Sequence, residues 1–171
     1  NSAGSTITGT ANNDVITGGA GVDAIDAGAG DDTIDISQSA TTIDTLQFDV
    51  TTDGNDTITG FTSGVDILDF DGILNGVTKT YEEIASDTAD ITSDATVVVI
   101  GGTSAIATAA TLIAADTTVT GTAGLIVLYD GTNTLVYHST NLAADGTETL
   151  LATLVGITDT TTLVTADFIF A

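Results

Sequence analysis

The sequence predicts a mainly β protein, in which an N-terminal parallel β-roll is followed by a β-rich C-terminal subdomain with one or two short helices. Two observations lead to this fold class. Residues 9–35 repeat with a period of nine, and each repeat joins a Gly- and Asp-rich turn to a short apolar strand. Beyond residue 72 longer apolar runs replace the repeats. We therefore expect a roll over residues 1–72 and a subdomain over 73–171.

The repeats are three blocks of nine residues that begin at Gly9, Gly18 and Ala27, with a partial copy over residues 4–8. In each block the fourth residue is Gly or Asn, the sixth is Asp and the eighth is Ile. Gly and Asn allow the positive φ angles of a tight turn. The last three residues form a strand whose central Ile points to one side. Two blocks then make one coil of a parallel roll.

Turns that are 18 residues apart should stack on the same edge of such a roll. We expect the turn at residues 9–14 to stack on residues 27–32, and the turn at 18–23 to stack on the degenerate segment 36–41. Stacked turns present backbone carbonyls and Asp carboxylates to the gap between them. Hard oxygen ligands in a flexible cage suit Ca²⁺ better than Zn²⁺ or Mg²⁺, so several calcium ions are predicted.

The blocks resemble the calcium-binding nonapeptide of the RTX (repeats-in-toxin) family, whose fold is a β-solenoid. The second block matches the family pattern at every defined place, and the third departs from it only at Ala27. The expected ligand positions in the three blocks are the following: Gly9, Ala11, Asn12, Asp14, Gly18, Ala20, Gly21, Asp23, Ala27, Ala29, Gly30 and Asp32.

Residues 53–70 resemble the closing rungs of RTX rolls in serralysin-type proteases. The resemblance implies that Asp56 and Asp66 are further Ca²⁺ ligands, and that Asp53 and Asn55 are candidates. It also implies that the end of the core is closed by Phe61, Leu68 and Phe70. Asp44 lies in a degenerate rung and is a weaker candidate, and ordinary turn aspartates remain the alternative for all of them.

The C-terminal half shows patterns of strands and helices. Residues 81–85 suggest a short helix, residues 96–100 a buried strand, and residues 104–115 an Ala-rich helix. A hairpin is expected from 124–129 and 134–138, and another strand from 149–155.

The end of the chain resembles the C-termini of RTX proteins in four segments, which are residues 135–137, Asp145-Gly146, residues 151–154 and residues 166–170. An acidic residue followed by hydrophobic residues at the extreme C-terminus resembles a type I secretion signal. That resemblance implies an ABC-type secretion apparatus as a partner during export. An edge strand that ends the chain is the other interpretation, and the two are compatible.

Charge limits the classes of partner. The chain has 24 acidic residues against one basic residue, Lys79, and a formal net charge of −23. This balance excludes nucleic acid, which is bound through Lys and Arg, and disfavours anionic membranes. No run of about 18 apolar residues occurs, so we expect no membrane insertion. Metal cations would neutralise the charge; an acidic surface that only confers solubility is the alternative.

No catalytic or organic-cofactor site is predicted. The chain has no Cys, and its single His, His138, lacks the surroundings of a triad or a zinc-protease motif. We therefore expect that the chain is not an enzyme and that His138 is structural or exposed.

The chain begins at Asn1 without Met or a secretory leader, which suggests a processed chain or part of a longer one. The acidic, Thr- and Ala-rich composition resembles surface-layer (S-layer) proteins and giant adhesins. These features predict a secreted, extracellular module that folds with calcium and self-associates on a bacterial cell surface. Two alternatives stay open: the non-catalytic tail of a secreted RTX protease or lipase, and an adhesin or ice-binding module. One inward Ile per nine residues is a thin core, so residues 1 to about 70 should be disordered without Ca²⁺.

Overall fold

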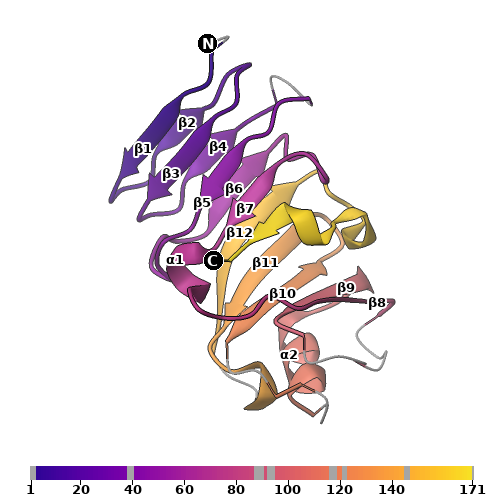
Figure 1. Ribbon diagram of the computed structural model, residues 1–171. Helices are drawn as coiled ribbons and strands as arrows, with labels where there is room; N and C mark the ends of the chain where they lie inside the picture. Colours follow the sequence, from indigo (N-terminus) through magenta and orange to yellow (C-terminus); the bar gives the residue numbers. More distant parts are fainter. Residues whose placement is uncertain are drawn as a thin grey trace.

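The computed structural model describes residues 3–37, 41–86, 91, 95–115, 119–120, 123–144 and 147–170. Its strands form two sheets that face each other over the first part of the chain (Figure 1). Sheet A consists, in spatial order, of β1 (Thr6–Thr10), β3 (Ala24–Gly28), β5 (Thr45–Gln47), β7 (Ile67–Asp69) and β13 (Phe168–Ile169). Sheet B begins with β2 (Val15–Thr17), β4 (Thr33–Asp35) and β6 (Asp56–Thr59). Successive strands thus alternate between two parallel sheets, which confirms the mainly β class and the roll.

Each sheet of the roll contributes a column of stacked inward side chains to the core. In sheet B, Ile16 pairs with Ile34 and Ile34 pairs with Ile58. In sheet A, Ile25 pairs with Leu46, which in turn pairs with Leu68. Each of these residues is at most 8% exposed. The period-two alternation of inward and outward residues, expected for strands, is therefore kept in every rung.

Sheet B continues beyond the roll into the C-terminal half of the chain. After β6 it contains β12 (Glu148–Val155), β11 (Thr134–Ser139), β10 (Gly124–Tyr129), β9 (Val97–Thr103) and β8 (Tyr81–Ile84). The hairpin β10–β11 and the strands β9 and β12 confirm the sequence predictions. Helix α2 (Ile106–Ala115), also predicted, connects the parallel pair β9 and β10 and packs on one face of the sheet through Ala109, Ala110 and Ile113.

The predicted helix over residues 81–85 is wrong, because Tyr81–Ile84 is a strand that pairs in parallel with Val97–Ile100. Tyr81 packs against the core that continues from the roll, whereas Ile84 belongs to the core under α2. Pairing with the strongly apolar β9 thus outweighs local helix propensity. The helix in this region is instead the short α1 (Asp71–Leu74), which follows β7 directly.

The last rung of the roll is assembled from the end of the chain. β12 pairs in parallel with β6 in sheet B, and β13 pairs in parallel with β7 in sheet A. The connection between them contains two 3-10 turns, Thr160–Thr162 and Thr165–Asp167. Residues 148–169 therefore continue both sheets by one further rung.

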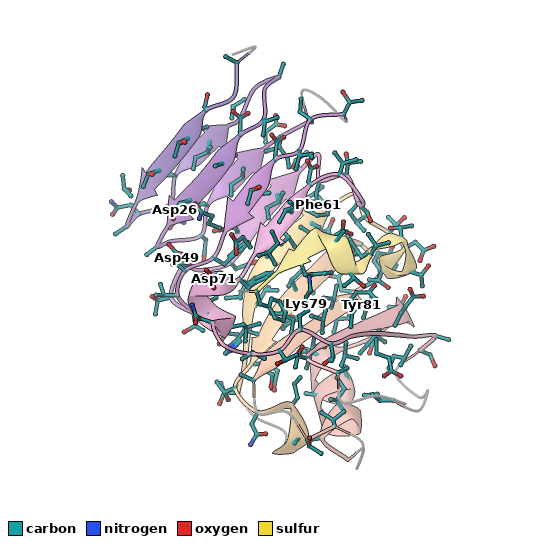
Figure 2. All side chains as sticks on the ribbon, in the orientation of Figure 1. Asp26, Asp49, Phe61, Asp71, Lys79 and Tyr81 are labelled. Carbon is teal, nitrogen blue, oxygen red and sulfur yellow. The ribbon has the colours of Figure 1, made fainter. Side chains whose placement is uncertain are left out.

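Lys79, the single basic residue of the chain, holds this last rung in place. Its Nζ donates hydrogen bonds to the carbonyl oxygens of Thr165, at 3.1 Å, and Phe168. The hydroxyl of Tyr81 donates to the carbonyl of Leu163 at 2.7 Å, and its ring lies 6.2 Å from that of Phe168. Figure 2 shows Lys79 and Tyr81 beside the C-terminal segment, which is drawn yellow.

Phe61, Leu68 and Phe70 are buried as expected, and Phe70 stacks on Phe48 at 4.9 Å between ring centroids. They do not end the core, which continues through Leu154 and Phe168. Because one core and one sheet run from the roll into the C-terminal half, the boundary at residue 72 stays a proposal about where the chain leaves the roll. No helix within the described residues is long and apolar enough to cross a membrane.

Candidate metal centre

The turns between the strands form two edges of the roll. Edge one consists of the turns that lead from sheet A to sheet B, at residues 11–14, 29–32 and 48–55. Edge two consists of the turns that lead from sheet B to sheet A, at residues 18–23, 36–44, 60–66 and 156–167. Residues 38–40 of the second of these turns lie outside the described residues.

Edge one carries a ladder of aspartates. The backbone N–H of Asp14 donates to Oδ1 of Asp32 at 2.6 Å, and that of Asp32 donates to Oδ1 of Asp56 at 3.1 Å. The predicted stacking of the turn at 9–14 on the turn at 27–32 is therefore confirmed. The steps are 18 and 24 residues long, so six residues are inserted before Asp56.

Edge two carries a second ladder. The N–H of Asp23 donates to Oδ1 of Asp44 at 2.8 Å, and that of Asp44 donates to Oδ1 of Asp66 at 3.0 Å. The steps are 21 and 22 residues long. The turn at 18–23 therefore stacks on a longer turn than the expected 36–41, one that ends at Asp44, because three residues are inserted there.

Three of the ladder aspartates keep one carboxylate oxygen without a partner. Oδ2 of Asp23, Asp32 and Asp44 is buried and accepts no hydrogen bond, and each residue is 1% exposed. A buried charged oxygen without a partner is costly. These atoms require either a proton or a cation, and they lie in the gaps between turns where the sequence predicts calcium.

Backbone carbonyl oxygens line the same gaps. A Cβ atom on Gly9 would lie 2.1 Å from the Ala27 carbonyl oxygen and 3.0 Å from Asp14 Oδ2. Only glycine allows this approach of carbonyl and carboxylate oxygens. Within the described residues, no three acidic, His or Cys side chains gather around one point. A cation here would need several carbonyl ligands beside a few carboxylates, a donor set made of oxygens that suits Ca²⁺.

Most of the predicted ligand positions fall in these turns, but Asp53 and Asn55 have other partners. Oδ2 of Asp53 accepts the N–H groups of Asp49, at 2.8 Å, and Val50, at 3.1 Å. Asp53 thus closes the inserted part of its own turn. Oδ1 of Asn55 accepts the hydroxyl of Thr153 in β12 at 3.1 Å. A role of either side chain as a calcium ligand remains a proposal.

Burial raises the pKa of the ladder carboxyls. It raises the pKa of Asp32, Asp44 and Asp66, and that of Asp56 to about 7, and neighbouring aspartates raise each of them further. Burial also raises the pKa of Asp53, and the nearby charges of Asp26 and Asp49 raise it further. Figure 2 shows Asp26, Asp49 and Asp71 along one edge of the roll. Calcium and protons should therefore compete for the same oxygens.

These shifts predict how stability depends on pH. A raised native pKa means that the folded state binds more protons than the unfolded chain between pH ~4 and the native value. In calcium-free buffer the free energy of unfolding should therefore fall as the pH rises from about 4 through about 7. Saturating calcium, which binds the deprotonated form, should reverse this trend. Thermal unfolding at pH 5 and pH 8, with and without calcium, measures both effects.

The matched control for this prediction is Asp56→Asn, which keeps an oxygen for the Asp32 N–H group but does not titrate. It should reduce the pH dependence of the calcium-free protein. An unchanged slope in this variant would show that general charge repulsion, not the Asp56 carboxyl, sets the trend.

Sequence reasoning missed three features of these edges. Asp44 was a weak candidate, because inserted residues hide its register. The aspartate of the last turn, Asp167, is fully buried; its Oδ1 accepts the Gly64 N–H and its Oδ2 accepts the Ser63 hydroxyl at 2.7 Å. In the sequence, the only feature that drew attention to Asp167 was its position just before the apolar residues at the C-terminus. Finally, edge one has a further series of hydrogen bonds between its turns. The Asp31 N–H donates to Asn13 Oδ1, and the Asn55 N–H donates to Asp31 Oδ1.

His138 lies on β11 and is 6% exposed. Burial lowers its pKa, and its Nδ1 has no hydrogen-bond partner. The burial of His138 agrees with a structural position. Asp145-Gly146 of the C-terminal resemblance lies outside the described residues.

Comparison with known families supports the calcium assignment. Residues 1–34 match the family model of the RTX calcium-binding nonapeptide repeat, in four copies. No curated protein sequence matches the chain. Residues 1–34, which form the first rungs of the roll, are therefore similar to RTX calcium-binding repeats, which are typical of secreted proteins.

Proposed function

We propose that this chain is the calcium-dependent folding, secretion and assembly module of a bacterial S-layer or other cell-surface protein. The observation that carries the proposal is the set of buried carboxylate oxygens of Asp23, Asp32 and Asp44, which have no partner in the stacked turns. Calcium would supply that partner. The ligands would be the ladder carboxylates together with carbonyl oxygens of the adjacent turns, which satisfy the preference of Ca²⁺ for six to eight oxygens.

Net charge supports coupling between calcium and folding. The chain carries a formal charge of −23, and both ladders place like charges on adjacent rungs. Repulsion of this kind opposes a compact state, and the short strands of the roll each offer few inward side chains to favour it. Binding energy of a metal that is held only by the folded state adds directly to its stability.

An extracellular site of action follows from typical affinities. Extracellular calcium modules bind at about 10⁻⁴–10⁻³ M, which is far above the free calcium of a cytosol. The roll would then stay unfolded before export and fold once outside the cell. The C-terminal segment would act as the type I secretion signal while it is unfolded. After folding, β13 of that segment would pair with β7, as it does in the structure.

A calcium titration followed by far-UV circular dichroism and light scattering tests this function. We expect β structure to appear as calcium reaches the millimolar range, and particle size to grow afterwards. Growth of the particles supports assembly, whereas β structure in a protein that stays monomeric favours the tail of a secreted enzyme. A roll that is fully folded in calcium-free buffer at pH 8 would contradict calcium-driven folding.

The ice-binding alternative receives little support from the arrangement of threonines. The chain has Thr-Ile-Thr triplets at residues 6–8 and 57–59. The first lies on sheet A and the second on sheet B, so the two triplets share no face. On the outer side of sheet B, Thr59 is next to Asp35 in register. A charged residue interrupts the array that a flat threonine surface would need.

A further inference from the structure

His138 is a buried ionisable side chain that lies outside the turns of both edges of the roll. It is 6% exposed on β11, and its Nδ1 is buried without a hydrogen-bond partner. Three residues further along the chain, Oδ1 of Asn141 is likewise buried without a partner. A buried polar atom that makes no hydrogen bond costs free energy, so the end of β11 is a weak point of the sheet.

β11 is also the strand that joins the two cores of the molecule. It lies between β12, which pairs with β6 of the roll, and β10, which pairs with β9 (Figure 1). Val136 belongs to the core that continues from the roll, whereas Leu135 and Tyr137 pack against the core under α2. Whatever loosens β11 therefore disconnects the roll from the C-terminal half.

The surroundings of the His138 ring offer nothing that would stabilise a positive charge. In register, His138 pairs with Leu125 of β10 and Thr149 of β12. The titratable side chains of these two strands are Tyr129, at the far end of β10, and Glu148, whose Oε1 accepts the Ser139 hydroxyl at 3.0 Å. Burial lowers the pKa of His138, and no charged neighbour on any element contributes to the shift.

We propose that His138 is an acid-sensitive lock, which holds β11 in sheet B only while its imidazole is neutral. A proton on the ring places an unpaired charge in the interior, which is costly. Separation of β11 from β10 and β12 exposes the ring to water and removes that cost. Because β12 also closes sheet B of the roll, mild acid releases the last rung together with the C-terminal half. This inference goes beyond the proposed function and does not rest on it.

The direction of the pH effect follows from proton linkage. The unfolded chain binds a proton at His138 with a pKa of about 6.5, and the folded chain binds it only at lower pH. Unfolding therefore takes up a proton below pH ~6.5, and the stability of the folded state falls as the pH falls. The ladder carboxyls of the calcium-free protein have raised pKa values and act in the opposite sense. Acid thus favours the turns of the roll and disfavours the sheet around β11.

The first test compares the unaltered chain with His138→Leu in saturating calcium. Leu is apolar and of similar size, and it leaves no buried polar atom without a partner. Between pH 7.5 and pH 5.5 the unfolding constant of the unaltered chain should rise relative to that of the variant by up to about tenfold. The carboxyls titrate in both proteins, so their contribution cancels in this ratio. A ratio that does not change with pH would overturn the proposal.

His138→Gln is the matched control, because Gln is polar but does not titrate. Its unfolding constant should follow the same pH profile as that of His138→Leu. A pH profile like that of the unaltered chain would show that the titration of His138 does not set the trend. Chemical denaturation at each pH, followed by circular dichroism, supplies the unfolding constants.

A second measurement uses the unaltered, calcium-loaded chain and needs no variant. His138 is the single His, so the imidazole signals in a proton NMR spectrum belong to it alone. As the pH falls from 7.5 to 5.5, we expect the signals of the folded state to keep the shift of a neutral ring. Signals of an open state with a charged ring should appear as the amide signals of β10, β11 and β12 weaken. A smooth titration of the ring near pH 6.5, with these amide signals intact, would contradict the lock.

Discussion

Replacing Phe168 by Ala should lower the free energy of unfolding by about 3–5 kcal/mol, as deletion of a fully buried Phe does elsewhere. The side chain is 0% exposed and fills the roll core at its last rung. Its backbone pairs with Leu68 of β7, so loss of packing at this point should also loosen the strand that closes sheet A. Chemical denaturation at saturating calcium, followed by circular dichroism, measures the change.

Phe170→Ala is the matched control for this prediction. Phe170 is two residues away in the same segment, and it is only partly buried against the same core. Its removal should cost about 1 kcal/mol or less. Equal effects of the two substitutions would mean that the segment contributes general apolar cover and does not close the roll through Phe168.

Gly54→Ala should be the most damaging single methyl addition in the turns of edge one. Gly54 has φ +98°, and a Cβ atom there would lie 2.0 Å from the carbonyl oxygen of Gly30 in the preceding turn. The strain of a left-handed residue costs about 1–2 kcal/mol, and forcing the turns apart adds about 1–3 kcal/mol. Because the displaced carbonyl lies in the gap between turns, calcium affinity should fall together with stability.

Gly64→Ala separates these two costs. Gly64 also has a positive φ, +75°, but a Cβ atom there would meet nothing within 4 Å. This variant should show only the strain, about 1–2 kcal/mol, and should leave the calcium affinity of the edge-one sites unchanged. Thermal unfolding and calcium titration of both variants give the comparison; a Gly64→Ala variant as damaging as Gly54→Ala would refute the role assigned to turn spacing.

The sequence alone determined the roll and the positions of its first rungs. A strict nine-residue period with Ile at the eighth place predicts strands β2, β3 and β4 where the structure has them, because each block carries its own turn glycines and inward side chain. The strong apolar runs of β9 and β10 and the Ala-rich α2 were likewise predictable from local pattern. Oxygen ligands and Ca²⁺ follow from the same repeats.

Register beyond the third block was decided by the tertiary structure. Insertions of three and six residues break the period, so that Asp44 and Asp56 take places in the ladders that no fixed spacing indicates. Asp53, a predicted ligand, closes one of these insertions with its own carboxylate. Loops of variable length cost little free energy when they close over a stacked core, and the sequence therefore carries no periodic signal of where the stack resumes.

The sequence also did not predict which strands pair with each other at the end of the roll. β8 follows a helix-like pattern yet forms a strand, because β9 offers it an apolar edge. β12 and β13 complete the roll from about 100 residues further along the chain, and Lys79 and Tyr81 bind the segment that contains β13. Local propensity and spacing fix the turns and the inward faces, whereas contacts between distant segments choose which strand occupies the last place. Only the packed structure brings those segments together and leaves the oxygens of Asp23 and Asp44 buried without a partner.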